Sequence, residues 1–517
     1  AGYNPGTYNA TTGKWSVKPA GSSGEASTIS VYSKTSAAGY VDKGGELENS
    51  SIINVVGDNS AGFYVKSGTA YTGDRTSQPM NYGFGSITVD GKGSHGVLVT
   101  NEDGTTAKFS NRGSIETKQE GTVALYGVNG SKLDHQNKND REGHFYDDGT
   151  GKAMTAAAWL AAGNTFDSNG ECGKDKCYVN LYSRVVEYTD LTENATIKAG
   201  DGGTGIWVEQ SRSIFTPTTP VTARTNVIVA APIEVGNSTA NYTAVGIYSD
   251  GSATVDLRKG PAYDTNPTKY SADMASIKVG ENGIALLHNY RDRIGQLNAN
   301  AVFGGSSGIF NINALKADLG NSSTLAYTNA GGLATNTLQN VIFTNVGNDV
   351  TFAYSANNGS INVNNTYLTD FLINPNGVTV GQNTVPFVAE NGFITNNVTD
   401  ATVGATGIAG LVMNTKVGLQ SFSKNNTPVG AVYAKTKTLN NGTITMTGRP
   451  TDGAVAMYTK YGKVENSVSG KVNIEDDNSI GLYGIDSSQV LNTGTVNVKG
   501  NSSLGLYGVS DDLLNPT

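Results

Sequence analysis

A repeat of 24 residues constrains the fold of this chain more than any other feature. One copy begins at Gly470 with GKVNI and reaches Tyr483, and the next begins at Gly494 with GTVNV and reaches Tyr507. A single unit of this size cannot bury its own apolar residues, so such units must stack on one another. The sequence therefore predicts a solenoid.

Each repeat contains two apolar half-motifs. The first, Gly-x-Ile-x-Val, alternates apolar and polar residues, as does a strand with one buried face. The second, x-Gly-Leu-Tyr-Gly, is bounded by Gly and Asn, which tolerate the left-handed backbone of tight corners. We expect two short strands and a longer return per coil, and parallel crossovers are nearly always right-handed. The predicted fold is all-β, a right-handed parallel β-helix of roughly 15 coils and about 70 Å.

Looser copies of the half-motifs recur upstream and bring tyrosines to equivalent places. They are found at 51–65, 85–99, 111–127, 195–208, 233–248, 277–286 and 441–458. The pattern leaves open whether the recurring rings stack inside the coils or cover the outside, because apolar residues alternate around them. The tyrosines concerned are Tyr64, Tyr126, Tyr248, Tyr458, Tyr483 and Tyr507.

Interruptions of the repeat divide the chain into six parts. Loops that interrupt a solenoid are free to vary and are its usual functional sites. We expect a cap at 1–50, coils at 51–128, an inserted excursion at 129–189, coils with proline-containing loops at 190–298, irregular coils at 299–400 and regular coils at 401–517.

The excursion at 129–189 is the predicted contact site. Its alanine-rich run from Met154 to Gly163 predicts one short helix. Cys172 and Cys177 close a short loop if they form a disulfide, which requires an oxidising compartment. The candidate ligand-binding residues are Arg141, Asp147, Asp148 and Trp159.

Charge and hydropathy narrow the partners. The net charge is −8, which disfavours nucleic acid and anionic lipid. No run of eighteen apolar residues occurs, so we expect no membrane insertion by this segment. A monomer is expected.

Enzyme motifs are weak in this sequence. Gly304–Gly308 matches Gly-x-Ser-x-Gly, but no helix is predicted after it, and with 66 glycines a chance match is expected. Gly202–Trp207 lacks the aspartate of a calcium-binding repeat. We expect no catalytic residue, no cofactor and no metal.

The coil Asn-x-Gly-x-Ile-x-Val … Ser-x-Gly-Leu-Tyr-Gly resembles the passenger domains of large type V (type Va) autotransporters, most specifically the long fusobacterial outer-membrane adhesins. The copies at 470–484 and 494–508 carry the resemblance closely, and those at 111–127 and 233–248 more loosely. The resemblance covers about 60% of the chain. It implies a virulence-associated passenger, exported through the periplasm and displayed on a Gram-negative surface with its N-terminus farthest out.

The resulting hypothesis is an adhesin segment, a rod whose loops attach to a host-cell receptor, a glycan or partner bacteria. Two alternatives stay open. One is a structural spacer of a larger passenger. The other is a β-helical polysaccharide lyase or glycosidase, which needs clustered carboxylates that the regular coils do not supply in one segment.

Overall fold

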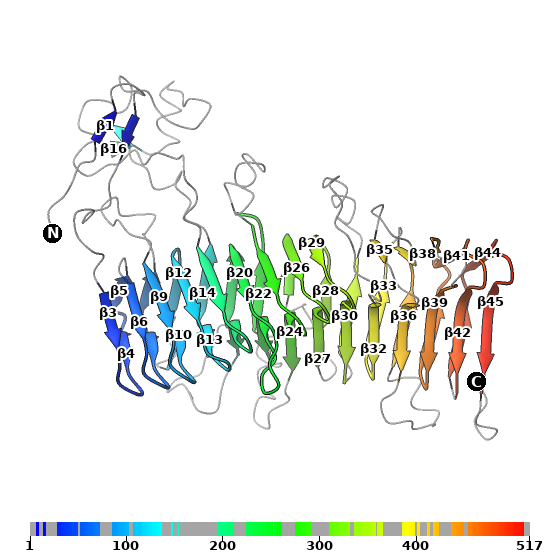
Figure 1. Ribbon diagram of the computed structural model, residues 1–517, viewed down its shortest axis with the longest axis horizontal. Coiled ribbons are helices and arrows are strands. Elements are labelled where there is room, and N and C mark those ends of the chain that lie inside the picture. The colour runs from blue at the N-terminus through cyan, green and yellow to red at the C-terminus, as the bar shows by residue number, and fades with distance from the viewer. Residues whose placement is uncertain are drawn as a thin grey trace.

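The chain forms a parallel β-helix whose coils follow one another along a single rod (Figure 1). The computed structural model describes residues 7–9, 14–16, 28–49, 52–72, 85–102, 107–136, 146–147, 153–154, 195–210, 224–251, 253–260, 274–290, 310–330, 335–357, 359–364, 385–398, 401–403, 411–413, 417–422, 436–448, 453–486 and 488–510. Within these residues all regular structure is strand, which confirms the predicted solenoid.

Each full coil contributes one strand to each of three faces. The long sheet, which is continuous over the whole rod, holds fourteen parallel strands. Its strands are β4 (Ala37–Val41), β7 (Ala61–Val65), β10 (His95–Val99), β13 (Val123–Gly127), β18 (Thr204–Glu209), β21 (Val245–Asp250), β24 (Ile284–Tyr290), β27 (Thr324–Ala330), β30 (Thr351–Ala356), β32 (Val385–Glu390), β36 (Val417–Phe422), β39 (Val455–Lys460), β42 (Ile480–Ile485) and β45 (Leu504–Val509).

The face that precedes the long sheet in each coil, here the first face, is divided between a nine-stranded and a five-stranded sheet. The nine strands are β3 (Thr28–Val31), β6 (Ile52–Val55), β9 (Ser86–Val89), β12 (Ser114–Thr117), β17 (Thr196–Ala199), β20 (Pro232–Val235), β23 (Ser276–Val279), β26 (Leu315–Leu319) and β29 (Val341–Val346). The five are β34 (Ala401–Val403), β35 (Leu411–Met413), β38 (Thr443–Met446), β41 (Lys471–Ile474) and β44 (Thr495–Val498).

The third face follows the long sheet and is divided into sheets of seven and six strands. The seven are β5 (Glu46–Asn49), β8 (Thr69–Thr72), β11 (Lys108–Asn111), β14 (Lys132–Gln136), β19 (Asn226–Ala230), β22 (Thr254–Leu257) and β25 (Phe310–Ile312). The six are β28 (Thr335–Leu338), β31 (Ser360–Val363), β33 (Phe393–Asn396), β37 (Lys437–Asn440), β40 (Lys463–Asn466) and β43 (Gln489–Asn492). The return, expected as loop, therefore carries a third strand.

Two short antiparallel pairs lie outside these faces. β1 (Thr7–Asn9) pairs with β2 (Lys14–Ser16), and β15 (Tyr146–Asp147) pairs with β16 (Ala153–Met154). Met154, the first residue of the predicted helix, is thus in a strand, and 155–163 lie outside the described residues. Residues 28–49, expected in the N-terminal cap, form the three strands of the first coil.

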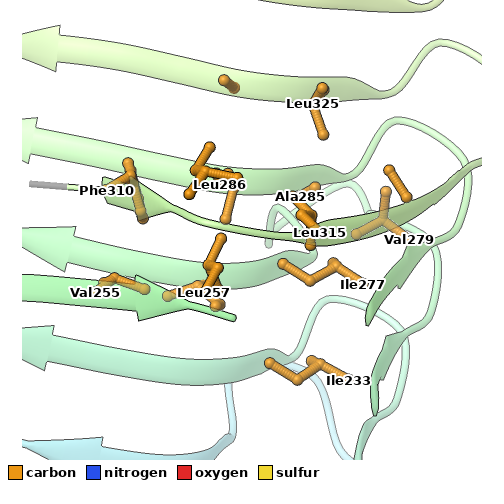
Figure 2. Packing of buried hydrophobic residues seen from close by; sticks show 14 of the residues in the cluster. Ile233, Val255, Leu257, Ile277, Val279, Ala285, Leu286, Phe310, Leu315 and Leu325 are labelled. Atoms are coloured by element: carbon orange, nitrogen blue, oxygen red, sulfur yellow. The ribbon is translucent and has the colours of Figure 1, made fainter. Parts of the chain in front are cut away.

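The core is a column of aliphatic side chains from all three faces. First-face residues such as Ile233 and Ile277 meet Leu286 of the long sheet and Leu257 of the third face (Figure 2). The first-face strands bury every second residue, as the Gly-x-Ile-x-Val pattern predicts. Each buried layer covers the next, so the core runs without interruption along the rod.

Corner chemistry repeats with the coils. The turn from the first face to the long sheet places a left-handed residue in successive coils, with φ of 52° at Asn59, 57° at Asn282 and 54° at Asn478. At the end of the third face the buried side chains of Asn396, Asn440, Asn466 and Asn492 form a chain of amide hydrogen bonds of 2.8–2.9 Å. Buried backbone and amide groups are thereby paired from coil to coil.

The bare coil has the predicted length, and inserted residues lengthen the others. Ala37 pairs with Ala61 and Ile480 with Leu504, both 24 residues apart. Val123 pairs with Thr204, 81 residues later, because residues 137–194 intervene after β14. An insertion between strands leaves the register of the flanking coils unchanged.

Candidate functional site

The predicted contact site at 129–189 overlaps the rod. β14 (Lys132–Gln136) belongs to the third face and pairs with β11 and β19, so the inserted part begins only after Gln136. Asp147 lies in β15 opposite Ala153. Arg141, Asp148, Trp159, Cys172 and Cys177 lie outside the described residues. The proposed ligand contacts and the disulfide therefore stay predictions.

The described residues assemble a different candidate, an aromatic column on the outer face of the long sheet. Strand pairing aligns one position of all fourteen strands. In chain order the residues at this position are Tyr40, Tyr64, Leu98, Tyr126, Trp207, Tyr248, Leu287, Tyr327, Tyr354, Val388, Gln420, Tyr458, Tyr483 and Tyr507.

The column lies outside the coils, which decides the alternative that the sequence left open. Tyr64 stands between Phe63 and Val65, which are both buried in the core, and Trp207 stands between the buried Ile206 and Val208. Because strand side chains alternate between faces, the rings point away from the core. The outside location does not leave every ring open, since Tyr126 is only 2% exposed.

Neighbouring rings in the column touch. Tyr327 and Tyr354 stack with centroids 5.0 Å apart, and Trp207 and Tyr248 lie 4.1 Å apart. At the two ends Tyr40 contacts Tyr64 at 5.4 Å, and Tyr483 contacts Tyr507 at 5.3 Å. These offset and edge-on pairs are favourable arrangements of aromatic quadrupoles.

Carboxylates lie beside the rings and accept their hydrogen bonds. The Tyr40 hydroxyl donates to Asp42 at 3.1 Å, and the Trp207 Nε1–H donates to Glu209 at 2.7 Å. The hydroxyls of Tyr64 and Tyr354 donate to Glu102 and Glu390. A charged acceptor holds an aromatic ring in one orientation more strongly than a neutral one does.

These bonds keep the phenols protonated. Burial raises the pKa of Tyr64 to about 12, and the hydrogen bond to Glu102 acts in the same direction. Burial and the bond to Glu390 also raise the pKa of Tyr354. The phenols therefore serve as neutral donors at physiological pH, not as bases.

The most open part of the column is a group of five residues that we call the N-terminal tyrosine patch: Tyr40, Asp42, Tyr64, Lys66 and Glu102. Tyr40 is 55% exposed, and its ring plane meets that of Tyr64 at 64°. The Lys66 Nζ lies 3.9 Å from both Asp42 Oδ2 and Glu102 Oε2. The patch thus combines two rings, two anionic acceptors and one cationic donor.

Backbone and hydroxyl groups fix the carboxylates of the patch. The Lys43 N–H and the Ser67 hydroxyl donate to Asp42 Oδ1 at 2.8 and 3.0 Å. The bond from the Lys43 N–H is the main reason that the pKa of Asp42 is lowered. The Thr100 hydroxyl donates to Glu102 at 3.1 Å. The acceptors are therefore ionised and held in place.

A sequence signal for this site existed but was not used. Several column aromatics are followed two residues later by a charged residue, as in Tyr40-x-Asp42, Tyr64-x-Lys66, Trp207-x-Glu209 and Tyr248-x-Asp250. Residues two apart on a strand share a face, so the spacing places ring and charge side by side. Glu102 and Glu390 reach their tyrosines from the next coil, which only strand pairing reveals.

Among the residues that the structure describes, no three His, Cys, Asp or Glu side chains gather as a metal site would require. The same residues contain no helix that is long and apolar enough to span a membrane.

Comparison with known proteins adds no family to this picture. No protein-family model matches the chain. No curated protein matches it, and no solved structure does. The protein is thus defined by its fold class, a parallel β-helix with an aromatic and acidic outer column.

Proposed function

We propose that this chain is an adhesive rod of a bacterial surface, which attaches a cell to host cells or to other bacteria and carries out no catalysis. The observation that carries the proposal is the aromatic column of the long sheet. Tyr and Trp are the residues most enriched at energetic centres of interfaces. Here they recur in register on a scaffold whose core is continuous, so the contact surface is rigid before any partner arrives.

The surroundings of the carboxylates support binding over catalysis. Asp42, Glu102 and Glu390 accept hydrogen bonds from the rings that they orient. A glycosidase or lyase instead needs a carboxyl group poised to exchange a proton with the substrate. The column also repeats along the rod, and several weak contacts on one rigid body add up to strong attachment.

The test is binding of the purified chain to whole epithelial cells and to other oral or gut bacteria. We expect saturable binding to at least one of these surfaces. No binding by the folded chain would contradict the proposal and favour the spacer alternative. Release of products from host polysaccharides would contradict the non-catalytic part.

A deletion separates the inserted segment from the rod. Removing residues 137–194 joins Gln136 directly to Ala195, so that two residues connect His135 to Thr196. In the preceding coil two residues also connect their strand partners Asn111 and Ser114. We therefore expect the shortened chain to keep its far-ultraviolet circular dichroism and its unfolding midpoint. Loss of cell binding would locate contact in the segment, and retained binding would locate it on the rod.

A further inference from the structure

The ligand chemistry of the N-terminal tyrosine patch can be taken further. We propose that this patch binds neutral carbohydrate, an inference that rests on the proposed adhesive function and names its ligand class. A sugar ring is amphipathic: its C–H face packs on an aromatic ring, and its hydroxyls need donors and acceptors at the rim. The patch supplies both kinds of surface within two successive coils and Glu102 of the third.

The two rings form an open angle instead of a closed stack. Their centroids are 5.4 Å apart and their planes meet at 64°, so neither ring covers the face of the other completely. Tyr40 keeps 55% of its surface exposed, an unusual amount for a large aromatic side chain that is tied down by a hydrogen bond. A ligand can pack on this ring without displacing a side chain.

The polar groups around the rings are ready for hydroxyls. Asp42 and Glu102 are acceptors fixed by their own hydrogen bonds, and Lys66 is a donor between them. A carboxylate has about four lone-pair sites, so one bond from a tyrosine or serine leaves acceptor capacity. Fixed, charge-assisted partners of this kind give small ligands their orientation and specificity.

Charge within the patch favours a neutral ligand over an ionic one. Lys66 lies at 3.9 Å from both carboxylates and offsets much of their charge, which weakens the attraction for a cationic peptide. An anionic ligand would meet two carboxylates beside a single ammonium group. A neutral saccharide suffers neither penalty.

The same combination returns at the other end of the column. Tyr458, Tyr483 and Tyr507 follow one another with centroid distances of 5.5 and 5.3 Å. Lys460 and Asp486 lie beside them as an ion pair of 3.5 Å. We call these five residues the C-terminal tyrosine patch. Tyr507 is 41% exposed. Two like patches on one face suit a repetitive polymer such as a glycan better than an irregular protein surface.

The first experiment is an array of neutral, sialylated and sulfated oligosaccharides probed with the purified chain. Titration of the best neutral oligosaccharide then compares wild type with Tyr40→Ala, Tyr458→Ala and the double variant. The matched control is Tyr242→Ala. Tyr242 is 47% exposed and lies in the turn before the long sheet, packed over Gly121 and Gly202 and outside the column.

We expect neutral saccharides to bind and Tyr40→Ala to weaken binding about tenfold, the size of one lost ring contact. The double variant should lose more, and Tyr242→Ala should change nothing. All four variants should keep the wild-type unfolding midpoint, since both column tyrosines are solvent-accessible. Equal binding by wild type and the double variant would overturn the proposal, as would binding confined to charged saccharides or to basic peptides.

Cell binding before and after periodate oxidation of cell-surface glycans distinguishes the two proposals. Binding that survives oxidation and the double substitution would leave the adhesive function standing and refute the carbohydrate ligand. Absence of both cell and saccharide binding would refute both.

Discussion

Two histidines lie inside the coils as neutral side chains, and their hydrogen bonds define which nitrogen carries the proton. His135 accepts from the Asn111 amide at Nδ1 and donates from Nε2 to the Pro232 carbonyl, both at 3.0 Å. His288 repeats the arrangement with Asn336 and the Gly251 carbonyl. A second proton at Nδ1 would face an amide N–H₂ donor. These histidines are therefore structural and serve no binding role.

Stability should fall in mild acid because of these two residues. Burial lowers the pKa of His135 and of His288 to about 4, whereas an unfolded histidine titrates at about 6.5. The unfolded chain therefore takes up protons first as the pH falls. The stabilisation is complete above about pH 6.5 and is lost between there and pH 4, by about 1.4 kcal/mol per unit for each histidine.

Urea unfolding at pH 7.5 and pH 5 measures this effect, and the midpoint should be lower at pH 5. Titration of the imidazole C2 protons by nuclear magnetic resonance provides the control. A titration near pH 6.5 for both buried histidines would show that the imidazoles are not held neutral by the fold.

At the scale of the element, the strands of the long sheet depend on glycine where two successive coils approach closely. A Cβ on Gly246 would lie 2.6 Å from the Ala285 carbonyl oxygen and 2.7 Å from Ile277 Cγ2. The equivalent Gly505 belongs to the last described coil, and a Cβ there would lie no nearer than 3.5 Å to Val496. The same residue type thus has different roles at two positions of one column.

Gly246→Ala should destabilise the chain by about 1–3 kcal/mol, since the carbonyl is backbone and the isoleucine is packed in the core. Gly505→Ala should change stability by less than about 0.5 kcal/mol, because its contacts are ordinary. Denaturant midpoints of the two variants test the comparison. Equal effects at both positions would mean that conformational freedom, and not coil spacing, selects glycine in these strands.

At the scale of the whole molecule, the coil is the unit that can be added or removed. Lys471 pairs with Thr495 and Ile480 pairs with Leu504, each 24 residues apart, so neighbouring coils are interchangeable in register. Each coil contacts mainly its two neighbours, which is the basis of additive stability in solenoids.

Deleting residues 471–494 removes one complete coil and joins Gly470 to Thr495, which Gly494 precedes in the native chain. We expect this variant to fold with a β-rich circular dichroism spectrum and to resist proteolysis. Deleting 471–482 instead removes β41 and half of β42 and brings strand segments from different faces together. That variant should lose resistance beyond β40. Similar behaviour of the two deletions would show that register does not control stacking in this array.

The sequence by itself determined the fold class and the coil length. Both follow from short-range periodicity: alternating Ile and Val mark strands, and Gly470 and Gly494 mark the repeat. It could not reveal the third strand, because the third-face segments such as KTLN of β37 and KVEN of β40 are polar enough to read as loop. It also left the direction of Tyr64 and its equivalents undecided.

Only the tertiary structure decided which side chains meet across coils. Glu102 reaches Tyr64 from 38 residues away, and the Tyr40 and Tyr64 rings are 24 residues apart. The excursion that ended the regular pattern drew attention to 129–189, although Lys132–Gln136 belong to the rod. Local pattern determines the strand and its buried face, but a surface composed of one residue from each coil exists only once the coils are stacked in register.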